Sequence, residues 1–581
     1  MKWPLFTLAM LFCLNIQAQN FYSEITSLPP SPGAEGIAAG DYNNDGYEDL
    51  YLSFPNYPNQ LWRNNGDGTF TNVAPDLGLD LSAADNTKAA IWGDIDNDGW
   101  LDLYIANKGA PDRLFKNNQG QSFTDISASA GIGQLGWPQS LNMADVNGDG
   151  FLDIYVANFQ EQNLLLLNNG DLTFSDNTIQ SGAVDEGKAM GAIFFDFDKD
   201  GDADLYLVHD GNEPNLLYQN DGSGHFTEVG VSTGANTASF AMGVDIGDVN
   251  NDGWPDIAIA NLYQNFLLLN DGSGTGFTDI SSSAGVGDLG MGWGISFLDF
   301  DLDGQQDLYL CNDYKFSPFP NLLFRNRGDL TFEKADTTGP VCNQYQSYGN
   351  AVFDLDLDGR PDIAVANRSD SEQAQVFHNE GPSGNWIGIK LIGVQSNRQA
   401  IGARIEMTDN TGELHYDELT AGNGWLSQGS RHFLFGLGTA DAITAMTIHW
   451  PSGLVQSVTP PAPGKYYTIA EGNEPQEGIL FGNATATAEP QPASNISLRV
   501  MPNPSRGFFV ATFKSPKAGR YLARLHTLTG RLVYEEEIEA HPGENSFSVN
   551  TTGLAPGQML ILNLTGDGWT TAVKVRVGSR E

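Results

Sequence analysis

Short apolar stretches alternate with Gly- and Asn-rich turns along most of the chain, and the same order of stretches returns about every fifty residues. In each unit an apolar run such as AAIWG (89–93) leads into an Asp-rich loop, and a second run such as DLYIAN (102–107) follows it. A third run and a Phe-led fourth run, FTDIS (123–127) in this unit, complete the set. Runs this short, bounded by turn residues, predict β-strands and leave no room for helices.

The repeat is defined by the pattern Asp-x-Asp/Asn-x-Asp-Gly-x-x-Asp, which occurs seven times. The copies, which we call Asp loops one to seven, begin at Asp41, Asp94, Asp145, Asp196, Asp248, Asp299 and Asp354. Four short strands in a unit of about fifty residues are typical of a β-propeller blade. The sequence therefore predicts an all-β protein whose first large domain is a seven-bladed propeller.

The phase of the repeat predicts how the ring closes. FYSEIT, from Phe21, has the pattern of a fourth strand but precedes the first Asp loop, and the seventh unit has no fourth strand before Trp386. We therefore expect the strand near Phe21 to complete the seventh blade, which removes the exposed sheet edges. An open solenoid is the alternative, and it leaves the strand near Phe21 without a partner. The predicted propeller covers residues 19–385.

The Asp loops have the composition of calcium-binding loops. Calcium prefers six to eight oxygen ligands, and the first, third, fifth and ninth positions supply side-chain oxygens while Gly at the sixth permits a sharp bend. The predicted ligands, for up to seven Ca²⁺ ions, are Asp41, Asn43, Asp45 and Asp49 in loop one; Asp94, Asp96, Asp98 and Asp102 in loop two; Asp145, Asn147, Asp149 and Asp153 in loop three; Asp196, Asp198, Asp200 and Asp204 in loop four; Asp248, Asn250, Asp252 and Asp256 in loop five; Asp299, Asp301, Asp303 and Asp307 in loop six; and Asp354, Asp356, Asp358 and Asp362 in loop seven.

Two other interpretations use the same letters. A helical EF-hand requires flanking helices and a Glu at position twelve, whereas strands flank these loops. Asp and Asn also form hairpin turns without any metal. Repeated clusters of four carboxylates without a cation cost on the order of several kcal/mol each, which favours calcium. Loops one, three and five have Asn at the third position, so a count of charges predicts that they bind calcium more weakly.

These units resemble the FG-GAP/VCBS repeats of integrin-type propellers, whose loops bind calcium, over roughly residues 21–385. From Trp386 the period stops, and NWIGIKLIG, IGARIEM, ELTAGNGWLSQ, HFLFGLG and IHWPSG follow in that order. This order is similar to the ASPIC/UnbV domain, and a propeller followed by that domain resembles the cartilage acidic protein (CRTAC-like) family. We expect a small β-rich domain over 386–470, in which Trp425, Trp450 and His449 either pack or contact a ligand.

The C-terminal region has a different composition. Residues 471–495 are rich in Glu, Pro, Ala and Thr, which predicts a linker. Beyond it, PNPSRG, LHTLTGRLV, LAPGQMLILNL and the terminal KVRV resemble a type IX secretion (Por) sorting domain over 496–581. The resemblance implies a small β-sandwich and an interaction with the type IX secretion machinery.

The N-terminus and the charge balance indicate export. Residues 1–18 have a basic start at Lys2, an apolar run and Ala18 before the expected cleavage, so they predict a signal peptide. No later segment has the length of a transmembrane helix. With 72 acidic and 29 basic residues and a net charge of -43, the chain is unsuited to nucleic acid. We expect it to be secreted or held on the outer cell surface, where Cys311 and Cys342 are either a disulfide or two buried thiols.

Two classes of function fit these features. No Gly-x-Ser-x-Gly motif and no metal-spaced His pair occurs, so we expect a calcium-dependent adhesion or ligand-binding protein and not an enzyme. The alternative is a polysaccharide-active lyase or hydrolase with its site opposite the Asp loops. Residues expected on that opposite face either bind an extracellular glycan or protein ligand or pack into the central channel; they are Lys88, Trp137, Lys188, Met242, Met291, Trp293, Tyr348, Tyr314, Phe316 and Phe319.

Overall fold

The structure is a computed structural model. It describes residues 21–26, 28–336, 339–479, 499–501, 508–515, 519–527, 532–541, 543–551, 559–566 and 569–576. The expected signal peptide (1–18) and most of the expected linker lie outside these residues. The chain divides into two compact units, residues 1–481 and 482–581, which are described separately. In the described part, no helix is long and apolar enough to cross a membrane.

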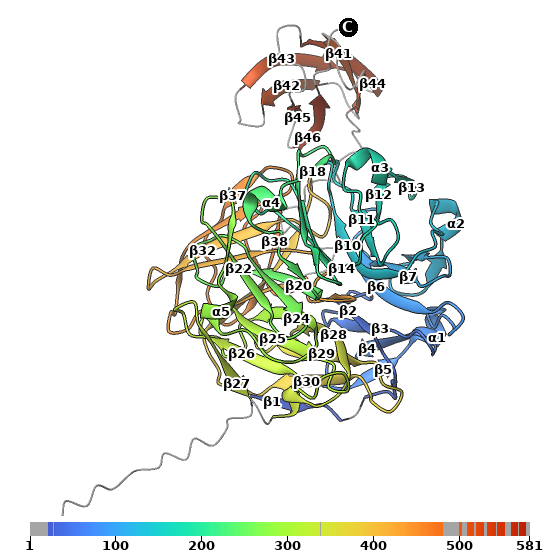
Figure 1. The fold of residues 1–581 in the computed structure, drawn as a ribbon. Coiled ribbons are helices and arrows are strands. Elements are labelled where there is room, and N and C mark those ends of the chain that lie inside the picture. Colours follow the sequence, from blue (N-terminus) through green and yellow to red (C-terminus); the bar gives the residue numbers. More distant parts are fainter. Residues whose placement is uncertain are drawn as a thin grey trace, which may run out of the picture. The chain divides into compact units, whose positions relative to one another are not determined.

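The first unit contains seven successive antiparallel sheets, which we call repeat sheets one to seven (Figure 1). Their first strands are β2 (Gly36–Gly40), β6 (Thr87–Gly93), β10 (Pro138–Ala144), β14 (Ala189–Phe195), β20 (Ala241–Gly247), β24 (Gly292–Leu298) and β28 (Ser347–Phe353). Their second strands are β3 (Asp49–Ser53), β7 (Asp102–Asn107), β11 (Asp153–Asn158), β15 (Asp204–His209), β21 (Asp256–Asn261), β25 (Asp307–Asn312) and β29 (Asp362–Asn367). Their third strands are β4 (Gln60–Asn64), β8 (Arg113–Asn117), β12 (Leu164–Asn168), β17 (Leu216–Asn220), β22 (Phe266–Asn270), β26 (Leu322–Asn326) and β30 (Gln375–Asn379). Their fourth strands are β5 (Phe70–Asn72), β9 (Phe123–Asp125), β13 (Phe174–Asp176), β18 (Phe226–Glu228), β23 (Phe277–Asp279), β27 (Phe332–Asp336) and, in sheet seven, β1 (Tyr22–Glu24).

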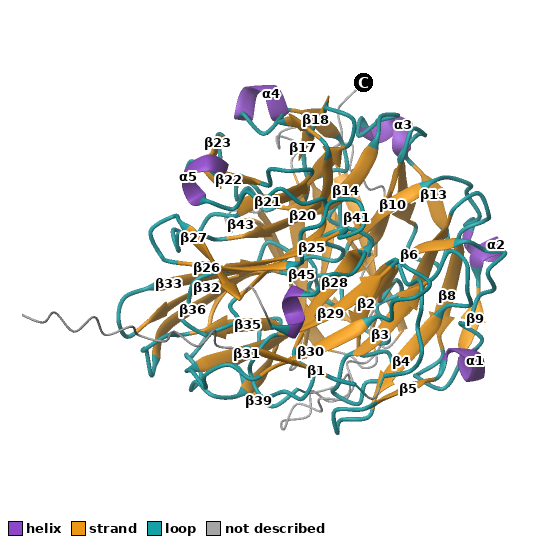
Figure 2. Cartoon of the chain, turned by 60° about the horizontal axis from the view of Figure 1, so that its bottom comes forward, coloured by secondary structure: helices purple, strands orange, loops and turns teal. Residues whose placement is uncertain are grey.

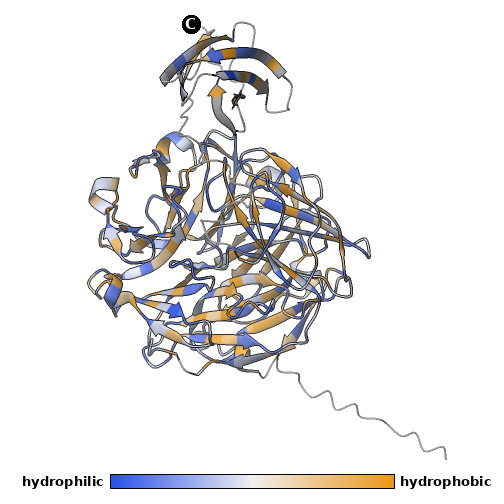
Figure 3. Ribbon diagram, turned by 180° about the vertical axis from the view of Figure 1, so that it is seen from behind, coloured by the Kyte–Doolittle hydropathy of each residue, from blue (hydrophilic) through white to orange (hydrophobic). Residues whose placement is uncertain are grey.

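The first and second strands of each repeat sheet are buried on both faces, whereas the fourth strands are largely exposed. Every residue of β11 is buried, and Tyr155 on this strand packs edge-on against Phe194 of the next sheet, with ring centroids 5.9 Å apart. Strands that are covered on both faces carry apolar side chains at consecutive inner positions, which explains the continuous runs in the sequence; Figure 3 shows these apolar segments in orange. A two-stranded ribbon of β16 (Glu213–Pro214) and β19 (Ala238–Ser239) supplements sheets four and five.

The seven sheets form a closed circle. As predicted, the strand near Phe21 pairs with the third strand of the seventh unit, with Tyr22 opposite Asn379. The first strands of successive sheets pack side by side, and β28 of sheet seven packs on β2 of sheet one. Asn64 of sheet one donates a hydrogen bond to the Leu355 carbonyl of sheet seven at 2.9 Å. No sheet edge is therefore left open between the first and the last repeat.

The prediction that helices have no room is wrong in a limited way. One-turn helices follow the fourth strands of the first five sheets and lie at the rim (Figure 2); they are α1 (Ala74–Leu77), α2 (Ser127–Ala130), α3 (Thr178–Ser181), α4 (Gly230–Thr233) and α5 (Ser281–Ala284). A 3₁₀ turn, η1 (Pro340–Cys342), precedes the last sheet. Each α-helix ends at a left-handed Gly, such as Gly78 with φ 71°. Helices this short fit between the punctuating glycines.

Residues 386–479 form a second β domain in the same unit. Its strands are β31 (Trp386–Ile392), β32 (Arg404–Asp409), β33 (Leu414–Glu418), β34 (Ser427–Gln428), β35 (Phe433–Gly436), β36 (Ile443–His449), β37 (Val455–Ser457), β38 (Tyr466–Ala470) and β39 (Gln476–Glu477). They make two sheets, β35-β31-β38-β39 and β33-β32-β36-β37, while β34 adds to repeat sheet one.

The second domain extends past the boundary that composition indicated. Residues 471–479 were expected in the linker, but β39 pairs with β38. Buried Glu471 also accepts hydrogen bonds from the backbone N–H groups of Val394, Gln395 and Ser396. These long-range bonds hold a polar segment that has no apolar pattern of its own.

Cys311 and Cys342 are both buried as thiols. They lie in one apolar cluster with Tyr309 and Phe377. Of the two alternatives for this pair, the structure shows small buried thiols.

The C-terminal unit contains two antiparallel sheets, β40-β41-β44 and β43-β42-β45-β46. Its strands are β40 (Arg499–Met501), β41 (Phe508–Ser515), β42 (Gly519–Thr527), β43 (Leu532–Ala540), β44 (Gly543–Asn550), β45 (Met559–Gly566) and β46 (Trp569–Arg576). Phe513 and Phe547 from one sheet and Leu525 and Leu562 from the other belong to one buried cluster. The two sheets therefore share a core.

Candidate calcium sites and the opposite face

Each Asp loop joins the first and second strands of its sheet, and its first Asp organises the turn. In loop two, Asp94 accepts hydrogen bonds from the backbone N–H groups of Asp98 at 3.0 Å and Gly99 at 2.7 Å. Asp98 in turn accepts one from Trp100 at 3.0 Å. Gly99 has φ 90°, which a side chain would strain. The loop is thus wound around its own carboxylates.

The ninth residue of each loop is an anchor in the core. Asp102 accepts hydrogen bonds from the backbone N–H of Ile95 at 3.1 Å and from that of Asn117 at 2.7 Å. The same two bonds recur at the other ninth positions, Asp49, Asp153, Asp204, Asp256, Asp307 and Asp362. All seven side chains are at most 1% exposed. Each oxygen keeps a second lone pair, so the anchor remains a possible cation ligand.

The structure brings acidic side chains together in the four loops that have Asp at the third position. Groups of three whose oxygens lie within 4.8 Å of one another are Asp94, Asp96 and Asp102; Asp196, Asp198 and Asp204; Asp299, Asp301 and Asp303; and Asp354, Asp356 and Asp362. Loops one, three and five, with Asn43, Asn147 and Asn250, form no such acidic group among the described residues. Four of the seven predicted sites therefore have three converging carboxylates.

Burial makes these carboxylates costly to ionise. Burial raises the pKa of Asp94 to about 7, and the charges of Asp98 and Asp96 add to the rise. Burial likewise raises the pKa of Asp354 to about 7 and that of Asp204 well above its ordinary value. The buried Oδ1 atoms of Asp96, Asp196 and Asp301 have no hydrogen-bond partner. Converging hard oxygens with unpartnered atoms fit a divalent cation.

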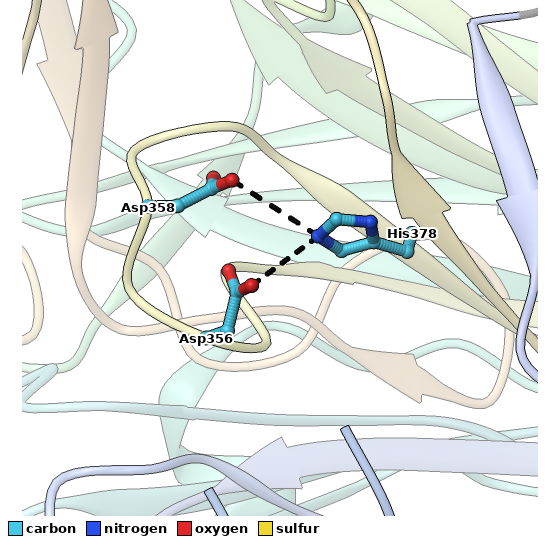
Figure 4. A group of neighbouring side chains, drawn as sticks. All are labelled: Asp356, Asp358 and His378. Atoms are coloured by element: carbon cyan, nitrogen blue, oxygen red, sulfur yellow. Dashed lines mark ion pairs between the residues drawn. The ribbon is translucent and has the colours of Figure 1, made fainter. Parts of the chain in front are cut away.

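Basic side chains from the third strands lie over three of these loops, which the sequence analysis did not foresee. Lys116 contacts loop two and Arg325 contacts loop six. Figure 4 shows His378 between the loop-seven residues Asp356 and Asp358, with Nε2 at 3.3 and 4.0 Å from their carboxylate oxygens. The contact with the Asp356 carboxylate raises the pKa of His378 to about 9. Each of these three residues comes directly before the Asn that ends a third strand. Aligning the repeats at this position would have identified them from the sequence.

That Asn is a second feature the sequence reasoning missed. The Asn117 side chain donates to the Tyr42 carbonyl of the preceding sheet at 2.8 Å, and Asn379 donates to Phe300 in the same way. Equivalent bonds come from the other third-strand ends, Asn64, Asn168, Asn220, Asn270 and Asn326. A belt of seven buried hydrogen bonds therefore ties each Asp loop to the next sheet. An invariant Asn at one register of the repeat is the signal for it.

The second domain covers the Asp-loop side of the ring. Arg404 forms an ion pair with Asp196 of loop four. Tyr466 donates a hydrogen bond to Asp354 of loop seven at 2.7 Å. Gln399 accepts one from the backbone N–H of Asp94 at 2.7 Å. The Asp loops therefore connect two domains as well as two strands.

One stretch of the second domain, residues 421–430, enters the middle of the ring, and we call it the central segment. Gly424 exchanges backbone hydrogen bonds with Val244 of sheet five at 3.1 and 2.7 Å. β34 pairs with β2 of sheet one, and Gln428 accepts a hydrogen bond from Trp92 of sheet two at 2.9 Å. The central segment thus contacts first strands from several sheets at once.

Trp425 packs within the ring and not within its own domain. Its ring centroid lies 4.6 Å from that of Trp293 and 5.1 Å from that of Tyr348, and Lys88 lies over it at 5.6 Å. The indole is 2% exposed. The sequence analysis left packing or ligand contact open for Trp425. The structure shows packing, and the packing partners come from repeat sheets. Trp450, by contrast, is buried in its own domain and bonds to Gln456 at 2.8 Å.

An acidic cavity of about 130 Å³ lies between the second domain and sheets five to seven. Its lining includes Asp245, Asp417, Glu418 and His432. Burial raises the pKa of Asp245 and Asp417 to about 7 each and that of Glu418 to about 8. Burial and nearby cations hold the pKa of His432 well below its ordinary value. Below about pH 7, the neutral forms of these groups are therefore favoured.

The cavity predicts an unusual pH dependence. A carboxyl whose pKa rises from 3.8 to about 7 on folding stabilises the fold in its protonated form, so stability falls as the pH increases from about 4 to about 7. Asp417→Asn removes this loss and is expected to stabilise the chain at pH 8 by on the order of 2 kcal/mol and to have little effect at pH 4. Denaturant unfolding at both pH values measures it. The exposed control Asp76→Asn is expected to change neither value; a loss of stability at pH 8 in Asp417→Asn contradicts the prediction.

The opposite side of the ring carries exposed apolar side chains. They lie in turns between second and third strands and in links between sheets, and are Tyr57, Leu135, Phe240, Tyr263, Leu289, Phe316 and Tyr345. We call these seven, five aromatic residues and two leucines, the aromatic face. Of the residues predicted there, Phe316 is 63% exposed, whereas Lys88, Met242, Met291 and Tyr348 are buried. The other six members were missed because each stands alone in a polar turn.

Comparison with known families agrees with this fold. A family model described as an FG-GAP-like repeat matches six overlapping stretches, 41–105, 94–156, 145–207, 196–259, 248–310 and 299–365. Together they cover more than half of the 581 residues. The chain belongs to the FG-GAP-like repeat family. A second family model, described as ASPIC and UnbV, matches residues 393–476 of this FG-GAP-like repeat protein.

Curated relatives share parts of the FG-GAP-like repeat protein. Human cartilage acidic protein 1 is 28% identical over 188 residues, which are 30% of this chain and 28% of the relative. The mouse protein of the same name is 23% identical over 454 residues, 73% of this chain and 62% of the relative. The chain thus spans less than two thirds of the length of the relatives it matches. Together with the two family models, these relatives support a CRTAC-like protein.

Two solved structures align with this chain at low similarity. Sqt1 of Saccharomyces cerevisiae aligns with a TM-score of 0.40 at 10% identity, over 61% of this chain and 98% of that one. An Agrocybe aegerita lectin, described as recognising non-reducing terminal N-acetylglucosamine, aligns with a TM-score of 0.36 at 19% identity, over 54% and 81% of the two chains. At these scores neither likeness bears on function.

Proposed function

We propose that this protein is an exported, calcium-stabilised, seven-bladed β-propeller that binds an extracellular glycan or protein ligand, as an adhesion or recognition protein. One observation carries the ligand-binding role. The Asp-loop side of the ring is covered by the second domain, whereas the opposite side presents the aromatic face. Exposed aromatic groups in a ring of turns suit stacking on sugars or packing against a protein surface.

The calcium role rests on the loops. Asp94, Asp96 and Asp102 in loop two, and the equivalent residues of loops four, six and seven, would hold the ion through carboxylate oxygens. Calcium would neutralise carboxylates that burial makes costly to ionise. Extracellular calcium modules bind at about 10⁻⁴–10⁻³ M, a range that suits an exported protein. Its role here is structural, because the loops lie under the second domain and away from the aromatic face.

Export is proposed from the two ends of the chain. Residues 1–18 would direct the chain out of the cytoplasm, and residues 496–581 would serve as the type IX sorting domain. Its two sheets with a common apolar core are compatible with the small β-sandwich that the resemblance implies. The family relationship also suggests an extracellular protein.

Binding to glycan arrays and immobilised extracellular proteins tests the ligand-binding role. Phe316→Ser and Tyr263→Ser are expected to weaken binding at least about tenfold without lowering the melting temperature, because both side chains are exposed. Val231→Ser, exposed on the rim helix α4, is the matched control and should bind as the wild type does.

Two results would contradict this proposal. Equal binding by Phe316→Ser, Tyr263→Ser and Val231→Ser would remove the aromatic face as the ligand site. Turnover of any bound glycan would replace the binding role with the polysaccharide-active enzyme considered from the sequence.

A further inference from the structure

A Lys or Arg side chain occupies part of the cation position in loops two and six, as His378 does in loop seven. Lys116 Nζ lies 2.5 Å from an oxygen of Asp96 and 2.8 Å from one of Asp98. Arg325 Nη2 lies 2.8 Å from an oxygen of Asp301 and 3.0 Å from one of Asp303. These carboxylates are the third and fifth residues of loops two and six. They are also the groups that a calcium ion would need.

Comparison of the seven repeats shows that this position varies with the loop. The residue before the third-strand Asn is Arg63, Lys116, Leu167, Gln219, Leu269, Arg325 and His378 in sheets one to seven. Where the loop has Asp at the third position, this residue is Lys, Gln, Arg or His. Where the loop has Asn, it is Arg or Leu, and Arg63 donates a hydrogen bond at 3.5 Å to Asn65 outside loop one. Each loop that has four Asp residues is thus accompanied by a polar or basic side chain at this position.

The formal charges of loops two and five are equal once Lys116 is counted. Loop two has four Asp residues, so Lys116 brings its formal charge from -4 to -3. Loop five has three Asp residues and Asn250, with Leu269 at the equivalent position, and its formal charge is also -3. A count of acidic residues alone therefore overstates the pull of loop two on a cation.

We propose that Lys116 and Arg325 are internal counter-cations that lower the calcium affinity of loops two and six. The inference rests on the calcium role proposed above. An incoming ion must displace the basic group from its carboxylates or bind beside it against charge repulsion. The buried Oδ1 atoms of Asp96 and Asp301 have no hydrogen-bond partner, so each loop keeps an oxygen for calcium. Loops two and six then bind calcium no more tightly than loop five, although each has one Asp more.

Exchanging the side chains between two sheets tests the inference on the full chain. Lys116→Met and Arg325→Met keep the length of the aliphatic stem, and each is expected to raise the calcium affinity of one site at least about tenfold. Leu269→Lys is the reciprocal change and should weaken loop five by a similar factor. Arg63→Met, whose guanidinium bonds outside its loop, is the matched control and should leave every affinity unchanged.

Calorimetric calcium titration, with bound calcium counted by atomic emission, gives the affinities. Terbium, excited through Trp100 of loop two or Trp254 of loop five, assigns them to individual loops, and Trp100→Phe identifies the loop-two signal. Tighter binding in Lys116→Met at the Trp100 signal supports the inference. If the wild type binds calcium and the affinity is unchanged in both Met variants and in Leu269→Lys, the counter-cation inference is overturned, while the proposed calcium role stands. A wild-type chain that binds no calcium overturns that role instead, and a calcium site gained in Lys116→Met would still support the counter-cation.

Discussion

Removal of calcium with a chelator is expected to lower the melting temperature of the full chain by about 10 °C or more. Each site filled at a hundred times its Kd contributes about 2.7 kcal/mol, and several such sites act on one ring. Without the ion, carboxylates such as Asp94, Asp204 and Asp354 must be protonated or face one another in a buried loop. A change of this size exceeds what any single surface substitution produces.

Scanning fluorimetry in calcium and in chelator, with magnesium as the control ion, measures this effect. Magnesium requires tighter octahedral geometry and is expected to restore little of the loss. Equal melting temperatures in calcium and in chelator, with no metal bound, would falsify the calcium role and reduce the loops to hydrogen-bonded turns.

Trp425→Ala is expected to destabilise the first unit by about 3–5 kcal/mol. The substitution empties a buried site at the centre of the ring, where the indole touches Trp293 and Tyr348. The lost volume cannot be refilled from one side, because first strands of several sheets surround the central segment.

The location of the damage distinguishes this effect from a general loss of stability. Hydrogen exchange is expected to rise in β24 and β28, which carry Trp293 and Tyr348, and to change less in β31 and β38. Trp450→Ala, a cavity of equal size within the second domain, should give the reverse pattern. The same hydrogen-exchange pattern in both variants would show that Trp425 does not stabilise the repeat sheets more than the second domain.

The sequence was sufficient for the repeat and its closure, because both depend on local patterns. The spacing of the Asp loops predicted one sheet for each loop, and the strand near Phe21 was placed correctly from its phase alone. The grouping of Asp94, Asp96 and Asp102 agrees with the predicted ligands, although the ions themselves stay a prediction. The strands and turns of each repeat are defined by residues within about ten positions of one another, so the sequence pattern shows them directly.

Contacts between distant segments could not be predicted in this way. The central segment reads as AGNGWLSQGS, a polar, Gly-rich loop, and nothing near it indicates that Gly424 pairs with Val244. Ion pairs across strands were also missed, because the count of acids in a loop ignores Lys116, which lies 18 residues after Asp98. Comparing the third strands register by register would have found this residue.

The order in which the chain is made limits when the ring can assemble. The strand at Tyr22–Glu24 meets a partner about 357 residues later in the sequence, so the first part to be synthesised takes its place among the last. Until β30 has been synthesised, β1 has no partner strand, and unpaired strands recruit other chains. The middle of the ring stays empty until about fifty more residues have been synthesised and the central segment can enter it. Folding of this protein is thus expected to be slow and all-or-none across the seven repeats, unlike that of an open array that grows one repeat at a time.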